Sequence, residues 1–464
     1  MTDSYTDKTQ PKPFRERLQL RAQSLGEKSA EISIRWMPET FTFAVLVTVI
    51  VFLCAWLGTE TRPVQIVEYW YGGFWSLLTF GMQMVLIVVT GYALAVAPPV
   101  KRVLARIAAQ LGSASAAIAV TALLSGVISY VHWGLGTILS CLFAVEIAKS
   151  FKTRGIRCHF PLLVASAYSG TAVAMVGLSS SAALLMNTPG HFLEDSIGLV
   201  PLTDTIFRPQ YIMIVVAATL TAAIVLTYLH PSQKNTQEMD ENASSPFGGD
   251  ETRETARTPG QRLDNMPMLA WLIGLVGIVF ILQEMMEQGI IGIQLNVLNF
   301  FFLMLGILLH GSLKSYSNAL TKGALAAAGI VLLFPFYGGV LGVMRDSGLV
   351  DIVASGFVAI STENTFALWQ MISAGVLNFA IPSAGGQWAV QGPIAVTASQ
   401  ELGLPIDVPA MSVMLGESLT NLAQPLWLIP LLGISGLRAG QVLGYTIVLM
   451  AFLFVVFGGG LLLL

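Results

Sequence analysis

Long, unbroken apolar runs are the feature that most limits what this chain can fold into. They lie at about 40–58, 74–97, 113–131, 211–229, 267–283, 296–312, 324–344 and 440–464. Charged residues make up only 11% of the chain, against roughly 25% in soluble domains. The runs are too long and too evenly apolar for the alternating strands of a β-barrel. Because each membrane helix takes about 20 apolar residues, we predict an all-α polytopic membrane protein with roughly 10–12 transmembrane helices.

A polar interruption divides the membrane part into two halves. Residues 231–265 contain Pro, Gly, Ser and both charge signs without apolar periodicity, which is typical of a flexible linker. We therefore expect a tail at 1–36, a first membrane repeat at 37–230 and a second at 266–464. The tail lacks the apolar core of a signal peptide. Its basic residues favour a cytoplasmic N-terminus: Lys8, Lys12, Arg15, Arg17, Arg21, Lys28 and Arg35.

The distribution of charge indicates that the two halves are related. Residues 107–145 and 364–400 carry no formal charge, and each block holds a tryptophan about two-thirds of the way along, Trp133 and Trp388. A helix of this length would measure about 57 Å, nearly twice the hydrocarbon thickness. Each block must therefore fold back on itself, as two spans or as a re-entrant hairpin.

A matching interrupted helix follows each block. The first begins at Pro161 and is broken by small polar residues at 169–171 and 179–181. The second begins at Pro409 and is expected to break at 416–418, through Asn421 and Pro425. A strongly apolar span then closes each half. We predict two structural repeats, inverted relative to each other, each with a re-entrant hairpin and a discontinuous helix.

The basic clusters conflict with one detail of this topology. Residues 101–106 and 149–157 are both rich in Lys and Arg, so both favour the cytoplasm. A span at 113–131 followed by a non-crossing hairpin would place them on opposite sides. We give the repeat more weight than the loop charges and leave the side of the 231–265 loop open.

Broken helices near the bilayer midplane are typical of transporter binding sites. Their amides can hold a carboxylate, and their carbonyls can coordinate a coupling cation. The substrate-binding candidates are the hydroxyl, amide, aromatic and glycine residues at the four breaks; the alternative for each is helix packing. They are Ser129, His132, Trp133, Gly134, Ser169, Thr171, Ser383, Gly385, Gly386, Gln387, Trp388, Ser418, Thr420 and Asn421.

Two titratable residues stand out as ion-coupling candidates. Glu417 is the only formal charge between Asp407 and Arg438, and a carboxyl inside a membrane is a functional candidate. His132 is the only histidine in a charge-free block; it could exchange a proton or serve as a neutral hydrogen-bonding residue. Glu417 could instead reach an interface or hydrogen-bond locally. The three cysteines, Cys54, Cys141 and Cys158, form no CxxC pair, so no metal site is expected.

Several segments resemble a known family from about Trp36 onward. They are GFWSLLTFGMQMVLIVVTGYALA, HWGLG, NTPGH, FPFYGG, NFAIPSAGGQWAVQGP and GESLTNLAQPLW. The chain resembles the short-chain fatty acid uptake transporters, the bacterial acetoacetate/butyrate carriers. That family is similar to a wider superfamily of anion carriers with two re-entrant hairpins and two unwound helices. The resemblance implies short-chain monocarboxylates as substrates. The hairpin turns here differ from the Ser-Asn-Thr turns of sodium-binding relatives, so the resemblance does not by itself predict a sodium site.

The leading hypothesis is a secondary carrier that imports a short-chain fatty acid, coupled to H⁺ or Na⁺, in the bacterial inner membrane. The alternative is another organic anion, a dicarboxylate or sugar acid, on the same fold. An enzyme would need convergent titratable groups, and no phosphate-binding GxxxxGK[ST] loop is present. We expect no cofactor and no nucleic-acid partner. The expected partners are the bilayer and a small monocarboxylate, and a homodimer stays open.

Overall fold

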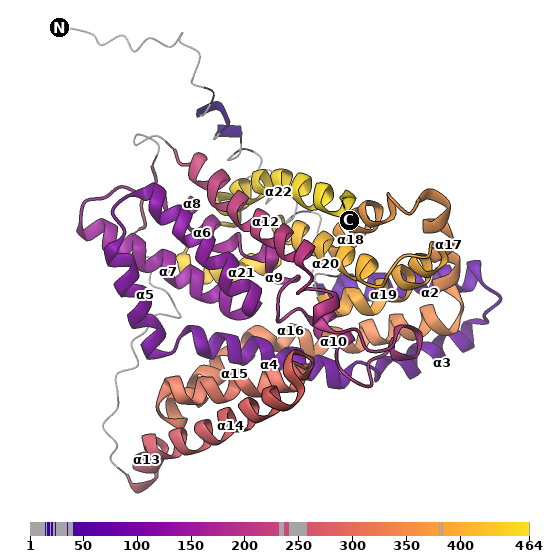
Figure 1. The fold of residues 1–464 in the computed structure, drawn as a ribbon, viewed down its shortest axis with the longest axis horizontal. Coiled ribbons are helices and arrows are strands. Elements are labelled where there is room, and N and C mark those ends of the chain that lie inside the picture. Colours follow the sequence, from indigo (N-terminus) through magenta and orange to yellow (C-terminus); the bar gives the residue numbers. More distant parts are fainter. Residues whose placement is uncertain are drawn as a thin grey trace.

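Helices account for every regular element in the part of the chain that the structure describes (Figure 1). This computed structural model describes 40–231, 236–240, 258–379, 381 and 384–463, and also 14, 16–18, 20–21, 24 and 35. The first half contains α2 (Thr40–Gly58), α3 (Pro63–Phe74), α4 (Leu78–Ala95), α5 (Pro98–Gln110), α6 (Ala114–Val131), α7 (Trp133–Thr153), α8 (Phe160–Tyr168), α9 (Thr171–Ala174), α10 (Ser181–Met186), α11 (Glu194–Ile197), η1 (Leu202–Asp204) and α12 (Pro209–Tyr228). The second contains α13 (Pro259–Asp264), α14 (Pro267–Gln288), η3 (Gly289–Gly292), α15 (Leu295–His310), α16 (Leu313–Asp346), α17 (Leu349–Ile360), α18 (Phe366–Asn378), α19 (Ala384–Glu401), α20 (Asp407–Asn421), α21 (Pro425–Ser435) and α22 (Ala439–Leu462).

Six of the described helical stretches are long and apolar enough to cross a membrane. They are α4, α6, α7, α12, Pro259–Gln288 and α22. The all-helical membrane fold is thus confirmed, and each predicted apolar run overlaps an observed helix along most of its length. The outer face of α14 is almost wholly apolar and exposed, with Trp271, Val276 and Met286 among its side chains. Such a face is stable against lipid and unfavourable in water.

Both charge-free blocks fold back on themselves as predicted. In the first, α6 and α7 pack against each other and are separated by the single residue His132, whose backbone is extended (φ −154°, ψ 105°). His132 ends α6 and caps α7, since its Nδ1 accepts a hydrogen bond from the Leu135 amide at 3.3 Å. In the second block the turn lies between the end of α18 at Asn378 and the start of α19 at Ala384.

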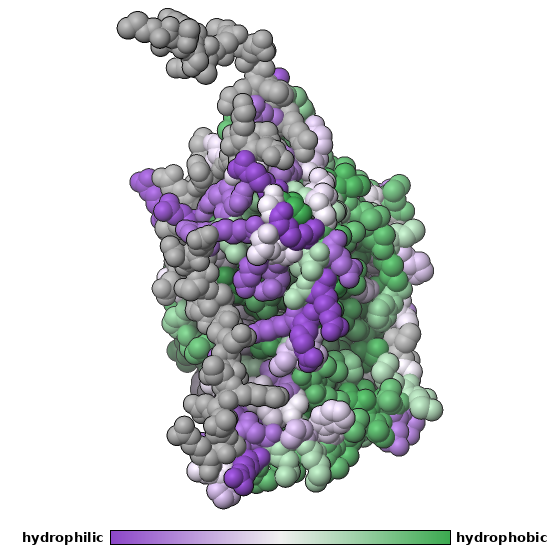
Figure 2. Space-filling model, turned by 90° about the vertical axis from the view of Figure 1, so that its left-hand side faces the viewer, coloured by the Kyte–Doolittle hydropathy of each residue, from purple (hydrophilic) through white to green (hydrophobic). Residues whose placement is uncertain are grey.

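The hairpin also resolves the conflict between the basic clusters. A guanidinium N–H of Arg154, just after α7, donates to the Ala109 carbonyl near the end of α5 at 3.0 Å. Both clusters therefore lie at one end of the molecule, because the whole of 114–153 is the hairpin and no separate span precedes it. The expectation that one span plus a hairpin would separate them was wrong. We call this the basic end; it faces the viewer in Figure 2, where hydrophilic residues gather over it.

The second hairpin opens at the opposite end of the molecule. α12 ends near the basic end, where His230 accepts a hydrogen bond from the His159 amide at 3.3 Å. The N-terminal end of α12 directly follows Arg208, which forms an ion pair with Asp407 at the start of α20. At this same end Gln400, in the last turn of α19, donates to the Ser196 carbonyl. The two hairpins thus enter from opposite ends, in agreement with inverted repeats.

Both interrupted helices are present, but the second break covers only the last part of the stretch predicted for it, 416–425. The first helix breaks after Tyr168 and again at 175–180, as expected. The second continues through 416–418 and breaks only at 422–424. Gly416 does not interrupt α20 because it serves close packing: a Cβ there would lie 2.1 Å from the Met371 carbonyl oxygen of α18. The chain breaks where Pro425 begins α21, because proline cannot continue the preceding hydrogen-bonding pattern.

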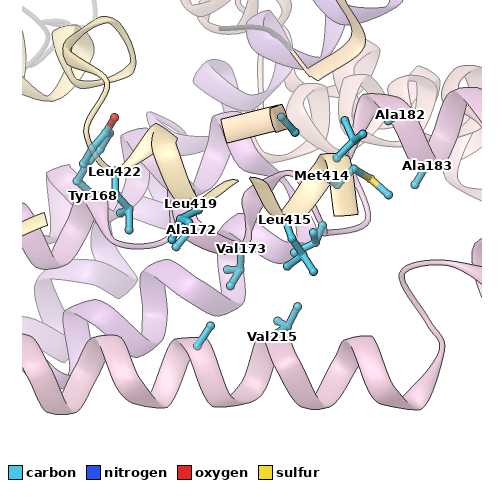
Figure 3. Close-up of a cluster of buried hydrophobic side chains, with 14 of the residues drawn as sticks. Tyr168, Ala172, Val173, Ala182, Ala183, Val215, Met414, Leu415, Leu419 and Leu422 are labelled. Carbon is cyan, nitrogen blue, oxygen red and sulfur yellow. The ribbon is translucent and has the colours of Figure 1, made fainter. Parts of the chain in front are cut away.

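The core joins the two halves around these broken helices. Figure 3 shows Tyr168, Ala172 and Val173 of the first broken helix beside Leu415, Leu419 and Leu422 of the second. Val215 of α12 closes the same cluster from below (Figure 3). All of these side chains are at least nine-tenths buried. Packing across the repeats therefore fixes where the breaks lie relative to each other.

Glycines allow a second close contact between the halves, where α3 crosses α16. A Cβ on Gly73 would lie 2.5 Å from the Gly338 carbonyl oxygen and 2.7 Å from the Gly342 Cα. A Cβ on the neighbouring Gly72 would meet nothing within 4 Å. Small residues that bring helix backbones together are the usual means of helix association in lipid.

This contact yields a matched pair of predictions for stability. Gly73→Ala should lower the free energy of unfolding by about 1–3 kcal/mol, because α3 and α16 must separate to admit the methyl group. Gly72→Ala should be neutral or stabilising by about 0.5–1 kcal/mol, since alanine favours the helix and the site is open. Thermal unfolding of both variants in detergent measures the difference. Equal effects would contradict the close α3–α16 contact.

Candidate functional site

The first hairpin turn meets the broken helix of its own repeat. The Trp133 amide donates to Ser179 Oγ at 2.9 Å, and the Leu178 amide donates to the Tyr130 carbonyl at 2.6 Å. Gly177 makes this approach possible, since a Cβ there would lie 2.1 Å from the Tyr130 oxygen. The non-helical residues 175–180 thus satisfy their hydrogen bonds on the turn instead of on water.

Trp133 connects this turn with both halves of the molecule. Its side chain packs with Ala174 and Met175 of the first broken helix and with Ala384 at the start of α19. Its ring also lies 5.3 Å from that of Trp427 in α21, in an edge-to-face arrangement. The indole N–H of Trp427 is buried and has no hydrogen-bond partner. The half-buried Trp133 therefore stands where the first hairpin, the second hairpin and both broken helices come together.

His132 lies beside Trp133 in the chain but turns to other neighbours. Its ring is fully buried, 4.2 Å from that of Phe302 in α15, and against Gly91 of α4. Nδ1 accepts the Leu135 amide, while Nε2 has no partner. The geometry therefore supports a capping role for His132 and places its ring away from α19 and α20.

The second hairpin is fastened to the second broken helix by Asn378. Its Nδ2 lies 2.7 Å from Asn421 Oδ1, 3.0 Å from Thr420 Oγ1 and 3.1 Å from the Glu417 carbonyl. In return, Gln424 Nε2 donates to the Asn378 carbonyl at 2.7 Å. The turn and the break thus form one hydrogen-bonded unit.

Glu417 lies one turn before this break, inside α20, and not at a helix break as predicted. Only 1% of its surface is exposed, and its Oε1 has no hydrogen-bond partner. Three neighbouring amide oxygens are also buried without a partner: those of Asn378, Gln387 and Gln424. A buried carboxyl that lacks a cationic partner is costly when ionised. It can be stabilised by taking up a proton or a cation.

Tyr168 links the two broken helices directly. It is the last residue of α8, and its hydroxyl lies 2.7 Å from the Asn421 carbonyl and 2.9 Å from the Gln424 carbonyl. These carbonyls lie at the end of α20, where the helix cannot satisfy them. The sequence suggested that such carbonyls could coordinate a coupling cation; here they already accept from Tyr168 of the other repeat.

The remaining predicted residues divide into two groups. Ser169 donates to the Ser166 carbonyl of α8, Thr171 donates across the first break to the Tyr168 carbonyl, and Ser129 is wedged between Gly136 and Gly170, so local packing explains all three. Gly134 lies in the first turn of α7, against His132. The others are buried in α19 and α20 without a defined role: Gly385, Gly386, Gln387, Trp388 and Ser418. Trp388 lies one turn inside α19, whereas Trp133 is the first residue of α7, so the two tryptophans do not match in position. Ser383 lies outside the described residues.

Four residues that the sequence reasoning missed hold this centre together: Tyr168, Asn378, Gln424 and Trp427. Each lies within three residues of a break or a hairpin turn, and Gln424 directly precedes Pro425. Polar or aromatic residues next to a Ser-Gly pair or a proline inside an apolar run would have been a usable signal. Within the described residues, no group of three or more His, Cys, Asp or Glu side chains could hold a metal ion.

Known proteins match nearly the whole chain. A family model described as "Short chain fatty acid transporter" matches residues 22–464. Two curated proteins named "Putative short-chain fatty acid transporter" are similar to it. The one from Escherichia coli (strain K12) is 35% identical over 431 residues, covering 92% of this chain and 96% of its own. The one from Haemophilus influenzae (strain ATCC 51907 / DSM 11121 / KW20 / Rd) is 32% identical over 426 residues, covering 90% and 94%.

A solved structure shares the fold. The crystal structure of the Alcanivorax borkumensis YdaH transporter matches with a TM-score of 0.60 and 14% identity. The match covers 92% of this chain and 98% of that one. At so low an identity the likeness concerns the fold alone.

The Tyr168 contact predicts a measurable loss of stability. Tyr168→Phe should destabilise the protein by about 1–3 kcal/mol, because it removes the donor to the Gln424 carbonyl and one of the two donors to the Asn421 carbonyl, which keeps only the Gln424 amide. Tyr337→Phe is the matched control, since Tyr337 is as buried but its hydroxyl has no partner. It should be neutral or slightly stabilising. Thermal unfolding compares them, and a loss as large for Tyr337→Phe would rule out the specific role of Tyr168.

Proposed function

Because the chain belongs to the short-chain fatty acid transporter family, we propose that it is a secondary carrier that imports a short-chain monocarboxylate together with H⁺ or Na⁺. Membership of this family makes it a membrane transporter and not an enzyme. The observation that carries the coupling part of the proposal is Glu417, a fully buried carboxyl with an unpartnered oxygen beside the second break.

A monocarboxylate such as acetoacetate or butyrate fits the chemistry around Trp133. The apolar part of a short acid would lie against the Trp133 and Trp427 rings, which are 5.3 Å apart. The free indole N–H of Trp427 would donate to the carboxylate. Neither charge-free hairpin contains Lys or Arg, whereas a dicarboxylate would need further cationic or polar partners. A dicarboxylate or sugar acid is the second candidate.

Glu417 would couple transport to the ion gradient. A carboxyl that stays buried must be neutral or neutralised while it crosses between the two access states. Uptake of one proton, or pairing with one cation, would meet this requirement. His132 is a weaker candidate for the same task, because its ring faces α4 and α15.

The basic end would face the cytoplasm. It carries Lys101, Arg102 and Arg106 on α5 together with the cluster at 149–157, and positive charge is retained on that side. With this orientation, the carrier would lie in the bacterial inner membrane and the 231–265 linker would be on the cytoplasmic side.

The coupling role of Glu417 is tested by uptake into proteoliposomes. Radiolabelled acetoacetate is followed under an imposed proton or sodium gradient, and protein-free liposomes correct for permeation of the neutral acid. Glu417→Gln should abolish accumulation driven by the gradient yet retain exchange of internal for external substrate, because binding survives without the titrating group. Glu401→Gln, an exposed carboxyl at the end of α19, should behave as wild type.

The possible results separate the two parts of the proposal. Accumulation by Glu417→Gln at the wild-type level would exclude Glu417 from coupling. No uptake by folded wild-type protein under either gradient would exclude the monocarboxylate, and dicarboxylates and sugar acids would then be screened.

Substrate binding at the tryptophan pair is tested by removing one donor. Trp427→Phe keeps an aromatic ring and removes the indole N–H, so KM for acetoacetate should rise about tenfold or more, as expected for a lost hydrogen bond to a charged group. Trp271→Phe, on the exposed face of α14, is the control and should leave KM unchanged. An unchanged KM in Trp427→Phe would place the carboxylate elsewhere.

A further inference from the structure

One short part of the polar linker is bound to the basic end. Residues 236–240 lie against the corner between α7 and α8. The Gln237 amide donates to His159 Nδ1 at 3.0 Å, and the Phe160 amide donates to the Gln237 carbonyl at 2.8 Å. Glu238 pairs with Arg157 at 2.9 Å. We call this five-residue segment the linker latch.

The linker latch contacts both repeats. Gln441, in the first turn of α22, donates from Nε2 to Gln237 Oε1 at 3.1 Å. Met239 packs on the core that the two halves share. A segment that hydrogen-bonds α8 of the first repeat and α22 of the second holds these helices together at the basic end.

His159 is the centre of these contacts and fits only in its neutral form. A backbone amide is always a donor, so Nδ1, which accepts from Gln237, cannot carry a proton. The proton must then be on Nε2, which lies 3.0 Å from the Tyr445 hydroxyl of α22. Protonation of Nδ1 would set two N–H groups against each other and remove the bond to Gln237.

Helix α8 connects the linker latch to the candidate site. It is only nine residues long, every one of them buried. His159 directly precedes α8 and accepts the Leu163 amide through its carbonyl. The other end of the helix is Tyr168, whose hydroxyl holds the break in the second repeat. A shift of the N-terminal end of α8 would therefore reach Asn421 and Gln424 through a rigid element.

We propose that the linker latch is a proton-sensitive regulator of the site: it holds α8 and α22 together while His159 is neutral, and it is released when His159 takes up a proton. Its effect on transport rests on the proposed carrier function, whereas the latch itself does not. Acidification at the basic end, which import of an acid would cause, would then change transport through α8 and Tyr168.

The opposite end has a matching contact of different chemistry. There the Tyr211 hydroxyl of α12 donates to Asp407 Oδ2 at 2.9 Å, at the start of α20. Arg208 also pairs with Asp407. In both places a tyrosine of the closing span binds the first turn of the other repeat's broken helix. Of these two matching contacts, only the one at the basic end contains a histidine and a linker segment, so the titration of an imidazole acts on that contact alone.

The sign of the pH dependence follows from the surroundings of His159. The groups that face it are His230 just after α12, Tyr445 of α22, Glu238 of the linker latch, and Arg157 and Cys158 in its own loop. Burial, and then the nearby His230, lower the pKa of His159 from 6.5 to about 4. The latched form therefore binds fewer protons than the released form. Latching is fully stable above about pH 6.5 and is lost as the pH falls toward 4.

Hydrogen exchange measures latch release without any transport assay. We expect exchange of the 236–240 amides, corrected with an unstructured reference peptide, to rise up to about tenfold between about pH 7.5 and about pH 5.5, from the two pKa values. His159→Gln, which cannot titrate, should remove this pH dependence. His191→Gln, a histidine whose Nε2 contacts the Gly198 carbonyl at a separate site, is the matched control and should retain it. Equal protection of the wild type at both pH values would overturn the proposal.

A second variant covers the case in which His159→Gln does not fold. Tyr445→Phe keeps His159 and removes the hydroxyl at its Nε2, so exchange should be faster at both pH values and still increase in acid. Uptake into proteoliposomes then measures the effect on transport. Acid on the side of the linker latch should change the rate of acetoacetate uptake by the wild type but not by His159→Gln. Normal latch exchange without any uptake would contradict the carrier function alone, and uptake with pH-independent exchange would contradict the latch alone.

Discussion

The need to satisfy backbone groups where helices break inside the membrane organises this structure. A break exposes amides and carbonyls that lipid cannot hydrogen-bond, so each must find a partner in the protein. At the first break, the Tyr130 carbonyl and Ser179 Oγ supply acceptors for the Leu178 and Trp133 amides. At the second, the hydroxyl of Tyr168 serves the carbonyls at the end of α20. The second set of partners comes from the other repeat, so the breaks themselves tie the halves together.

The main outlines of the fold could be predicted because they depend on local composition. Charge-free blocks too long for one span had to fold back, and they do so at His132 and between Asn378 and Ala384. The basic clusters at 101–106 and 149–157 were a sound signal, and the error was to insert a separate span between them. Gly416 misled the prediction because a glycine that breaks a helix and one that lets two helices touch look alike in sequence. Only the distance to Met371 distinguishes them.

The candidate site could be predicted only in part, because its central contacts join residues far apart in the chain. Trp133, Thr420 and Asn421 were identified from the breaks, and all three make contacts there. Tyr168 was missed because a tyrosine inside an apolar run is usually a packing residue. Its role depends on a partner more than 250 residues away. Ser169 and Thr171 show the reverse case: hydroxyls next to a break that bond only to carbonyls three residues earlier in the chain.

The two ends of the molecule show how one architecture can respond to different conditions on its two sides. Inverted repeats place the same helices at both ends, so a tyrosine of a closing span binds the start of a broken helix in each. The partner is a carboxylate with an arginine at one end and a neutral imidazole at the other. The imidazole loses its acceptor nitrogen when it takes up a proton, and the contact at the other end contains no imidazole. Corresponding contacts built from unlike groups therefore make the two ends unequal, and this inequality would serve the proposed import of an acid in one direction.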